Sequence, residues 1–301
     1  MARTSLKVGG SLRDYLDATK RQPRLLGAVE RHLLTRPPED RRQDVLHPSE
    51  IVKEDFCRRA AYYQLTATAK KDSRPSLRLQ NIFDEGHAIH HKWQSRFREM
   101  GNLYGRWTCD NCETTWWGLP PVLGCVECTA PESCVRYSEV TLMSEPRYRI
   151  AGHADGWISD IGDDCLIEVK SIGSGTIRIE APEIWEKAEE NLEDAWRNIK
   201  RPFASHVRQG ALYLELGSQM VKRGYFDTFP DEIVFIYELK SNQDIKEFVV
   251  KRSQEITDRL LDTAARVVEA VDNRTLPACN LDRTKGCTRC RAYEHAKDLT
   301  L

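Results

Sequence analysis

The sequence predicts an α/β protein in which helices flank a mixed central β-sheet. Two observations lead to this fold class. Runs rich in β-branched and aromatic residues, typical of strands, occupy the middle of the chain, and longer stretches with apolar residues at helical spacing lie on both sides of them. The 301 residues, 40% of them apolar, are enough for one large domain or two small ones.

Charge balance and cysteine usage limit the class of protein. The chain has 45 basic and 46 acidic residues, so a nucleic acid would have to be bound by a local basic patch. It has no apolar run of the ~20 residues that a membrane helix needs, and its first residues lack the apolar segment of a signal peptide. We therefore expect a cytoplasmic protein with no membrane partner. Ten cysteines in a reduced compartment indicate metal binding rather than disulfides.

Helices are expected before the strand-rich region. Ser49 resembles an N-cap, and the apolar series after it predicts a helix through Ala61, with Cys57 inside it. Apolar residues at helical spacing predict a second helix over residues 79–100. This second helix carries three histidines, His87, His90 and His91.

Strands and further helices follow along the chain. Three strand-like runs lie at residues 137–143, 148–159 and 165–172, and a turn-rich segment joins the last two, which favours a meander. Beyond it we expect an acidic helical stretch at 182–199, a helix at 204–216, a strand at 233–239 and a long helix at 245–271.

Two acidic residues and a lysine come together in the predicted meander. Strand alternation puts Glu168 and Lys170 on one face, and Asp155 on the neighbouring antiparallel strand comes within reach of Glu168. Two close carboxylates repel each other unless a proton or a cation such as Mg²⁺ or Mn²⁺ lies between them. With Lys170 placed to orient a water, this set suits phosphodiester hydrolysis. Taken alone, the three residues fit an exposed cross-strand charge pair and a turn residue better than a catalytic site.

Four short motifs occur in a fixed order over residues 86–213. They are Gly86-His87-Ala88-Ile89-His90 (G-x-x-x-H), Gly152-His153-Ala154-Asp155-Gly156 (G-x-x-D), Glu168-Val169-Lys170 (E-x-K) and Gln209-Gly210-Ala211-Leu212-Tyr213 (Q-x-x-x-Y). The ordered set resembles the RecB-like branch of the PD-(D/E)XK nuclease superfamily. Within that branch it is similar to the iron–sulfur exonucleases related to the CRISPR-associated RecB-like exonuclease.

The resemblance implies a role for each matched residue. His90, Asp155 and Glu168 correspond to ligands of Mg²⁺ or Mn²⁺, Lys170 to the catalytic lysine, and Gln209 and Tyr213 to residues that support the lysine and contact DNA. The spacing of Gln209 and Tyr213 independently places them on one helix face. Glu139 is a further candidate for the site, with an ordinary strand-edge charge as the alternative, and His206 is a candidate phosphate contact.

The cysteines form two sets. The spacing Cys109-x2-Cys112-x12-Cys125-x2-Cys128 is typical of a zinc ribbon, in which four thiolates hold a structural ion. The second set joins Cys57 to Cys279, Cys287 and Cys290 in the tail. In the family that the chain resembles, one early and three late cysteines bind a 4Fe–4S cluster. Here the close pair comes last rather than first, so zinc remains an alternative for this set.

The resemblance also implies a domain organisation. We expect an N-terminal helical region at 1–78 that carries the first cluster cysteine, a restriction-endonuclease-like nuclease core at 79–273 and a cysteine-rich cluster segment at 274–301. The zinc ribbon forms an insertion at 104–135 within the core. Candidate DNA contacts flank the motif helices: Arg58, Arg59, Lys70, Lys71, the basic residues of 74–78, Arg96, Arg98, Lys200, Arg201 and Arg208.

The expected function is metal-dependent exonuclease action on single-stranded or end-opened DNA, in repair, recombination or DNA processing and with or without protein partners. The alternative is a non-catalytic or complex-dependent DNA-binding or assembly protein, stabilised by zinc and iron–sulfur centres. The presence of Asp155, Glu168 and Lys170 together favours the enzyme. The residues do not fix cleavage polarity, the choice between exo- and endonuclease action, DNA or RNA preference, or oligomeric state.

Overall fold

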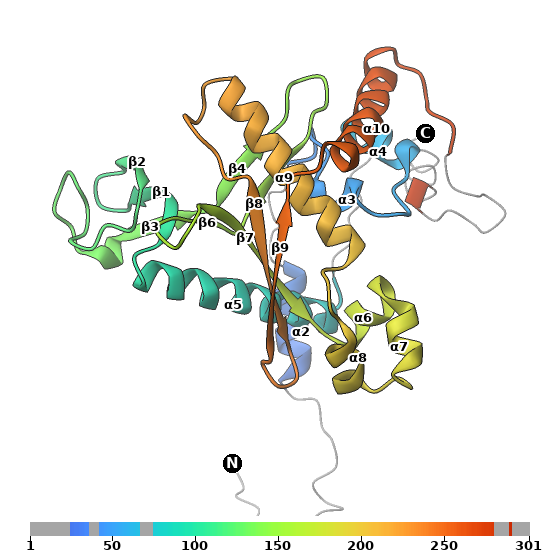
Figure 1. Ribbon diagram of the computed structural model, residues 1–301, viewed down its shortest axis with the longest axis horizontal. Helices are drawn as coiled ribbons and strands as arrows, with labels where there is room; N and C mark the ends of the chain where they lie inside the picture. The colour runs from blue at the N-terminus through green and yellow to red at the C-terminus, as the bar shows by residue number, and fades with distance from the viewer. Residues whose placement is uncertain (1–24, 36–41, 67–74, 280–288, 291–301) are drawn as a thin grey trace, which may run out of the picture. The chain divides into compact units, whose positions relative to one another are not determined.

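The computed structural model describes residues 25–35, 42–66, 75–279 and 289–290 (Figure 1). The chain divides into two compact units. The smaller, within residues 1–41 and 73–81, contains helix α2 (Leu26–Thr35) and the start of α5 (Leu77–Glu99). The larger, residues 42–72 and 82–301, contains the sheet and the site described below. Among the described helices, none combines the length and the apolar character needed to cross a membrane.

The larger unit is built on a seven-stranded sheet of order β2-β1-β6-β7-β8-β9, with β3 also paired to β1. Strands β7 (Cys165–Ile172) and β8 (Glu232–Leu239) are parallel, whereas the other neighbours in this sheet are antiparallel. A second sheet pairs β4 (Val140–Met143) with β5 (Ala151–Ala154). The remaining strands are β1 (Leu103–Cys109), β2 (Thr115–Gly118), β3 (Val135–Ser138), β6 (Gly156–Ile158) and β9 (Ile245–Lys251).

Helices cover both faces of the central strands. Helix α5 packs Ile89 against Val169 and Ile236 on one face. Helix α9 (Ala204–Lys222) lies on the other face, and its Gly210 is so close to β8 that a Cβ there would meet the side chain of Ile233 at 2.7 Å. The predicted fold class, a mixed sheet flanked by helices, is confirmed. Because Glu168 and Lys170 alternate with Val169, they lie on the face covered by α9.

The remaining helices lie around this core. They are α3 (Pro48–Ile51), α4 (Arg58–Leu65), α6 (Ser174–Glu180), α7 (Pro182–Lys187), α8 (Leu192–Asn198) and α10 (Gln254–Asp272), with a 3₁₀ turn at Glu132–Cys134. Helix α10 buries an apolar stripe that includes Leu260, Leu261 and Val267, and it packs against α9 and α4.

The predicted helix from Ser49 through Ala61 is wrong. His47, in an extended conformation, is the N-cap of α3, and Pro48 occupies its first turn, where a missing N–H costs nothing. This helix ends at Ile51. Cys57 lies before α4 rather than inside a helix: it is extended and acts as the N-cap, with its Sγ accepting a hydrogen bond from Ala60 N at 3.5 Å.

Two predicted strands and one predicted helix are each divided in two. The run at 148–159 breaks at Asp155, and its halves belong to different sheets, while the run at 137–143 breaks at Glu139. The predicted helix at 245–271 is wrong in its first part, because residues 245–251 pair with β8 as strand β9 and complete the sheet before α10 begins. The predicted helix at 204–216 extends to Lys222.

The acidic stretch at 182–199 forms two helices. Between α7 and α8, Glu189 and Glu190 adopt left-handed backbone conformations, with φ of 49° and 62°, which no helix can include. Asn191 then caps α8 by accepting hydrogen bonds from the backbone N–H groups of Glu193 and Asp194.

Candidate active site and metal centres

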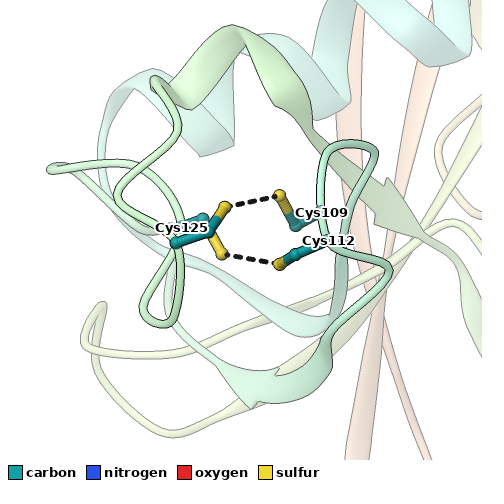
Figure 2. A group of neighbouring side chains, drawn as sticks. Cys109, Cys112 and Cys125 are labelled. Atoms are coloured by element: carbon teal, nitrogen blue, oxygen red, sulfur yellow. Dashed lines mark hydrogen bonds between the residues drawn. The ribbon is translucent and has the colours of Figure 1, made fainter.

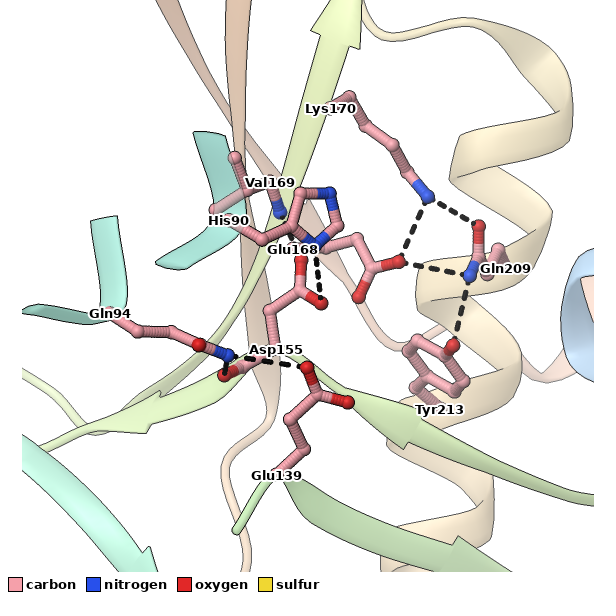
Figure 3. A network of polar contacts seen from close by, with 9 residues as sticks. All are labelled: His90, Gln94, Glu139, Asp155, Glu168, Val169, Lys170, Gln209 and Tyr213. Carbon is pink, nitrogen blue, oxygen red and sulfur yellow. Dashed lines mark hydrogen bonds and ion pairs between the residues drawn. The ribbon is translucent and has the colours of Figure 1, made fainter. Parts of the chain in front are cut away.

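A lysine held between a strand and a helix forms one half of the candidate site. Lys170 Nζ donates hydrogen bonds to Glu168 Oε1 at 2.8 Å and to Gln209 Oε1 at 3.0 Å. Gln209 Nε2 donates in turn to Glu168 Oε1 at 3.0 Å and to the hydroxyl of Tyr213 at 2.9 Å. Figure 3 shows this chain of contacts running from β7 to α9. The position of the ammonium group is therefore fixed by both elements.

Asp155 forms the other half, at the break between β5 and β6. Its Oδ2 accepts a hydrogen bond from Val169 N at 2.6 Å, and its Oδ1 lies 3.1 Å from His90 Nδ1 (Figure 3). Gln94, one turn along α5 from His90, donates to the Asp155 carbonyl oxygen at 2.8 Å and to Glu139 Oε1 at 3.3 Å. The interruption between β5 and β6 thus lets the Asp155 side chain face both α5 and β7.

The structure brings all six predicted site residues and Glu139 into one neighbourhood. They are His90, Asp155, Glu168, Lys170, Gln209 and Tyr213. Gln94 was not predicted, although its spacing of four residues from His90 on one helix would have suggested a shared face. Among the described residues, no hydrogen bond or ion pair joins His87 or His91 to this network, and His91 Nδ1 is instead hydrogen-bonded to Ser95.

Burial dominates the electrostatics of the site. Glu168 is 4% exposed, and burial together with the charge of Asp155 raises its pKa to about 7, against the opposing effect of Lys170. Burial and Asp155 also raise the pKa of Glu139. Burial acts to lower the pKa of His90, but the hydrogen bond and charge of Asp155 outweigh it and raise this pKa. Negative charge is thus concentrated where it is poorly solvated.

The donor set fits a divalent cation. Glu168 Oε2 is buried and has no hydrogen-bond partner within the described residues, which is costly for a carboxylate oxygen unless a cation or a water satisfies it. Two carboxylates suit Mg²⁺ or Mn²⁺. The ligand atoms of His90, Asp155 and Glu168 are more widely spaced than those of the cysteine groups, which in the described chain lie within 4.8 Å of one another.

The four cysteines of the predicted ribbon converge. Their Sγ atoms all lie within 4.8 Å of one another, with 3.7 Å between Cys109 and Cys128 and 3.5 Å between Cys112 and Cys125. Figure 2 shows Cys109 and Cys112 facing Cys125 across a small space. Four thiolates at the usual Zn–S distance would be about 3.8 Å apart, so this group can hold a single tetrahedral ion.

Hydrogen bonds already favour the thiolate form in part of the ribbon. Asn111 Nδ2 donates to Cys128 Sγ at 3.4 Å, and this bond is the main reason why the pKa of Cys128 is lowered to about 6. Trp107 is fully buried in the same cluster as Cys109 and Cys125, in line with a packing role.

The second cysteine set converges in part. The Sγ atoms of Cys57, Cys279 and Cys290 lie within 4.8 Å of one another, so this group too can hold a metal. Asp55 Oδ2 accepts hydrogen bonds from Arg289 at 2.9 and 2.5 Å, which ties the tail to the segment before α4. Cys287 lies outside the described residues.

Several predicted DNA contacts are engaged elsewhere in the protein. Arg98 bonds to Glu132 and lies over the Trp107 ring, and Arg208 donates to the carbonyl oxygen of Val52 at 2.8 Å. Lys200 and Arg201 line a cavity of about 790 Å³ beside the start of α9. Lys70, Lys71 and Arg74 lie outside the described residues.

The comparisons with known proteins return structural likenesses at low identity. No family model and no curated protein matches the sequence. The crystal structure of SSO0001 shares 13% identity at a TM-score of 0.36, over 92% of this chain and 94% of that one. An alkaline exonuclease from Laribacter hongkongensis, LHK-Exo, shares 10% identity at a TM-score of 0.42, over 86% and 94% of the two chains. Its complex with dAMP shares 12% identity at a TM-score of 0.42, over 77% and 90%. These likenesses say nothing about individual site residues.

Proposed function

We propose that this protein is a divalent-metal-dependent deoxyribonuclease that hydrolyses phosphodiester bonds from a free or opened DNA end. The observation that carries the proposal is the position of Lys170. Its ammonium group is fixed by Glu168 and Gln209 on the same face as a buried carboxylate oxygen that has no hydrogen-bond partner among the described residues. A fixed cation beside a cation-binding carboxylate suits phosphodiester hydrolysis, because both stabilise negative charge that develops on the phosphate.

Each residue has a defined task in this mechanism. Asp155, Glu168 and His90 hold Mg²⁺ or Mn²⁺, which when bound supplies a Lewis acid that offsets the charge developing on the phosphate. Lys170 orients the attacking water and faces the same developing charge. Gln209 keeps Lys170 in place and is itself kept in place by Tyr213. Val169 N holds the Asp155 carboxylate in one orientation.

The DNA strand approaches over the start of α9 in this proposal. Lys200 and Arg201 line the cavity beside that helix end and would contact the phosphates, although three glutamates also line it: Glu180, Glu183 and Glu255. Because such contacts are electrostatic, they favour any nucleic-acid strand and leave the choice of bond to the site itself.

Two cysteine centres stabilise the fold in this proposal. Cys109, Cys112, Cys125 and Cys128 hold Zn²⁺. Cys57, Cys279 and Cys290, with Cys287 as the fourth ligand, hold a 4Fe–4S cluster. In this proposal both centres are structural, and in the zinc site four protein thiolates leave no open coordination position.

Cleavage assays test the active-site assignment. The Glu168→Gln and Lys170→Met variants should lose Mn²⁺-dependent cleavage of end-labelled single-stranded DNA by at least about 100-fold, because each removes a group required in the transition state. Matched changes at exposed positions of α7, Glu186→Gln and Lys187→Met, should cleave like wild type. Wild-type rates in the Glu168 and Lys170 variants would contradict the assignment. A wild-type protein that binds DNA but never cleaves it would instead favour the assembly role.

Metal analysis tests the cysteine centres. Protein purified without oxygen should contain about four iron atoms and one zinc per chain and should absorb visible light. The Cys290→Ala variant should lose the iron and the colour but keep the zinc, whereas Cys165→Ala should keep both metals, because Cys165 lies in β7. Two zincs and no iron in the wild type would assign the second set to zinc.

A further inference from the structure

The ring of His206, near the start of α9, is held from one side by Tyr237. His206 Nδ1 is hydrogen-bonded to the Tyr237 hydroxyl, and the same hydroxyl accepts a hydrogen bond from Phe203 N at 2.9 Å. The imidazole also stacks on Phe235, with 6.0 Å between ring centroids and 13° between planes. Tyr237 is fully buried, so the Nδ1 edge of the ring faces the interior.

These contacts fix which nitrogen carries the proton. Tyr237 is fully buried, so its hydroxyl proton needs an acceptor, and among the described residues His206 Nδ1 is the only acceptor bonded to that hydroxyl. The Phe203 N–H binds a lone pair of the same oxygen and does not compete for this proton. A neutral imidazole whose Nδ1 accepts carries its proton on Nε2. Burial and the nearby charge of Lys170 hold the pKa of His206 well below its ordinary value, which keeps the ring neutral. His206 is therefore a neutral N–H donor.

The donor lies on the active-site side of α9. His206 is one helical turn before Gln209, and Tyr213 follows one turn after it, so the three side chains share a helix face. His206 is partly buried, and its Nδ1 edge is bonded to the buried Tyr237, so we expect its exposed part on the opposite edge, which carries Nε2. An anion drawn to Lys170 would meet this Nε2–H, and a phosphodiester has oxygens that accept such a bond.

We propose that His206 is a binding residue of this site, with its Nε2–H donating to a phosphate oxygen of the bound nucleic-acid strand while Tyr237 positions the ring. The assignment rests on the proposed nuclease function and adds a neutral donor to the charged groups already described. A neutral imidazole suits this position, because an imidazolium would be repelled by Lys170. A neutral N–H instead adds a directional hydrogen bond beside the ammonium group.

Two substitutions test the roles of the two ring nitrogens of His206 separately. In His206→Gln, the amide nitrogen reaches the position of Nε2 and can still donate to a phosphate. In His206→Asn, the amide reaches only the position of Nδ1 and keeps the internal bond to Tyr237. Binding is measured by fluorescence anisotropy of a labelled single-stranded oligonucleotide without added divalent metal, and kcat and KM are measured with Mn²⁺. Lys222→Gln, at the exposed far end of α9, is the control.

The expected result is that His206→Asn binds the oligonucleotide about 10- to 100-fold more weakly, as for the loss of a hydrogen bond to a charged acceptor, while His206→Gln stays within about threefold of wild type. Tyr237→Phe should weaken binding less than His206→Asn, because the donor remains but its tautomer is no longer fixed. The reverse order, with Asn tolerated and Gln defective, would overturn the proposal and leave His206 a purely internal role.

The binding assay tests the proposed phosphate contact of His206 independently of the proposed nuclease activity. If wild type binds the oligonucleotide but does not cleave it, the nuclease proposal fails, while the ranking of Gln and Asn still decides the contact. If wild type neither binds nor cleaves, both proposals are overturned.

Discussion

Gln209 links two groups on which the proposed chemistry depends. Its carbonyl oxygen accepts from Lys170 and its amide nitrogen donates to Glu168 and Tyr213, so the orientation of the amide is unambiguous. The proximity of Gln209 and Tyr213 could be predicted from their spacing on one helix. Their contact with Lys170 could be suggested only by the resemblance, because no local rule fixes how α9 packs on β7.

Removing the Tyr213 hydroxyl tests this chain of contacts. In Tyr213→Phe, Gln209 loses one of its bonds, and we expect kcat to fall about fivefold, the equivalent of one hydrogen bond of about 1 kcal/mol, with KM unchanged. Steady-state kinetics with Mn²⁺ measure the effect. Tyr225→Phe, at an exposed tyrosine outside the site, is the control and should match wild type. A change in KM alone would point to strand binding rather than to lysine positioning.

At the scale of elements, α5 is anchored to the sheet by one buried carboxylate. Glu238 on β8 is 2% exposed, accepts a hydrogen bond from Trp93 Nε1 at 2.8 Å and forms an ion pair with Lys92. His90 lies on the same helix, immediately before this anchor. The position of His90 beside Asp155 is therefore set from β8 as well as from β5 and β6.

A change at Glu238 should move α5 and weaken metal binding. Glu238→Gln leaves Lys92 without its charged partner, and we expect a loss of about 1–3 kcal/mol in the free energy of unfolding. The larger consequence should be weaker Mn²⁺ binding, measured by calorimetry, because His90 is no longer held. Glu247→Gln on the exposed side of β9 should change neither quantity. Unchanged Mn²⁺ affinity in Glu238→Gln would show that Glu238 does not hold His90 in place for metal binding.

The elements that the sequence failed to predict share one physical cause. The β9 sequence has apolar residues that fit a strand or a helix, and only its pairing with β8, set by the rest of the fold, selects the strand. The break at Asp155 is similar, because β5 and β6 form one continuous strand pattern but pair with different partners, β4 and β7. Strand β7 and most of helix α9 could be predicted locally, from a short apolar run and from apolar residues at helical spacing.

On the scale of the whole molecule, the ribbon and the sheet share a strand. The first residues of β1, Leu103 and Tyr104, pair with β6, while the later part pairs with β2 and β3. The ribbon strands and the core strands are therefore joined through β1 into one sheet, yet the four cysteines all lie on the ribbon side. The cysteine spacing was sufficient to predict this group, whereas the sharing of β1 was not predictable from spacing.

Metal removal should therefore unfold the ribbon and leave the core intact. In Cys112→Ser, or after chelation, we expect the backbone amides of β2 and β3 to exchange rapidly with solvent, because a short segment without its own large core depends on the ion. Amides of β7 and β8 should stay protected. Hydrogen-exchange mass spectrometry reports both, and Cys134→Ser, outside the four-cysteine group, is the matched control. Loss of protection in β7 would mean that ribbon and core form one cooperative unit.

The shared strand also has a practical use. Arg106 on β1 and Ser138 on β3 are paired in one antiparallel ladder. The chain therefore enters the ribbon and leaves it at neighbouring points. The entropic cost of closing such a loop rises only slowly with the number of residues in it. Leu123, 95% exposed between the two cysteine pairs, is accordingly a place to insert an affinity tag or a fluorophore. A larger exchange of the segment between Arg106 and Ser138 would also have to replace Trp107, which is buried in one cluster with Ile158 and Ile167 of the strands that carry the site.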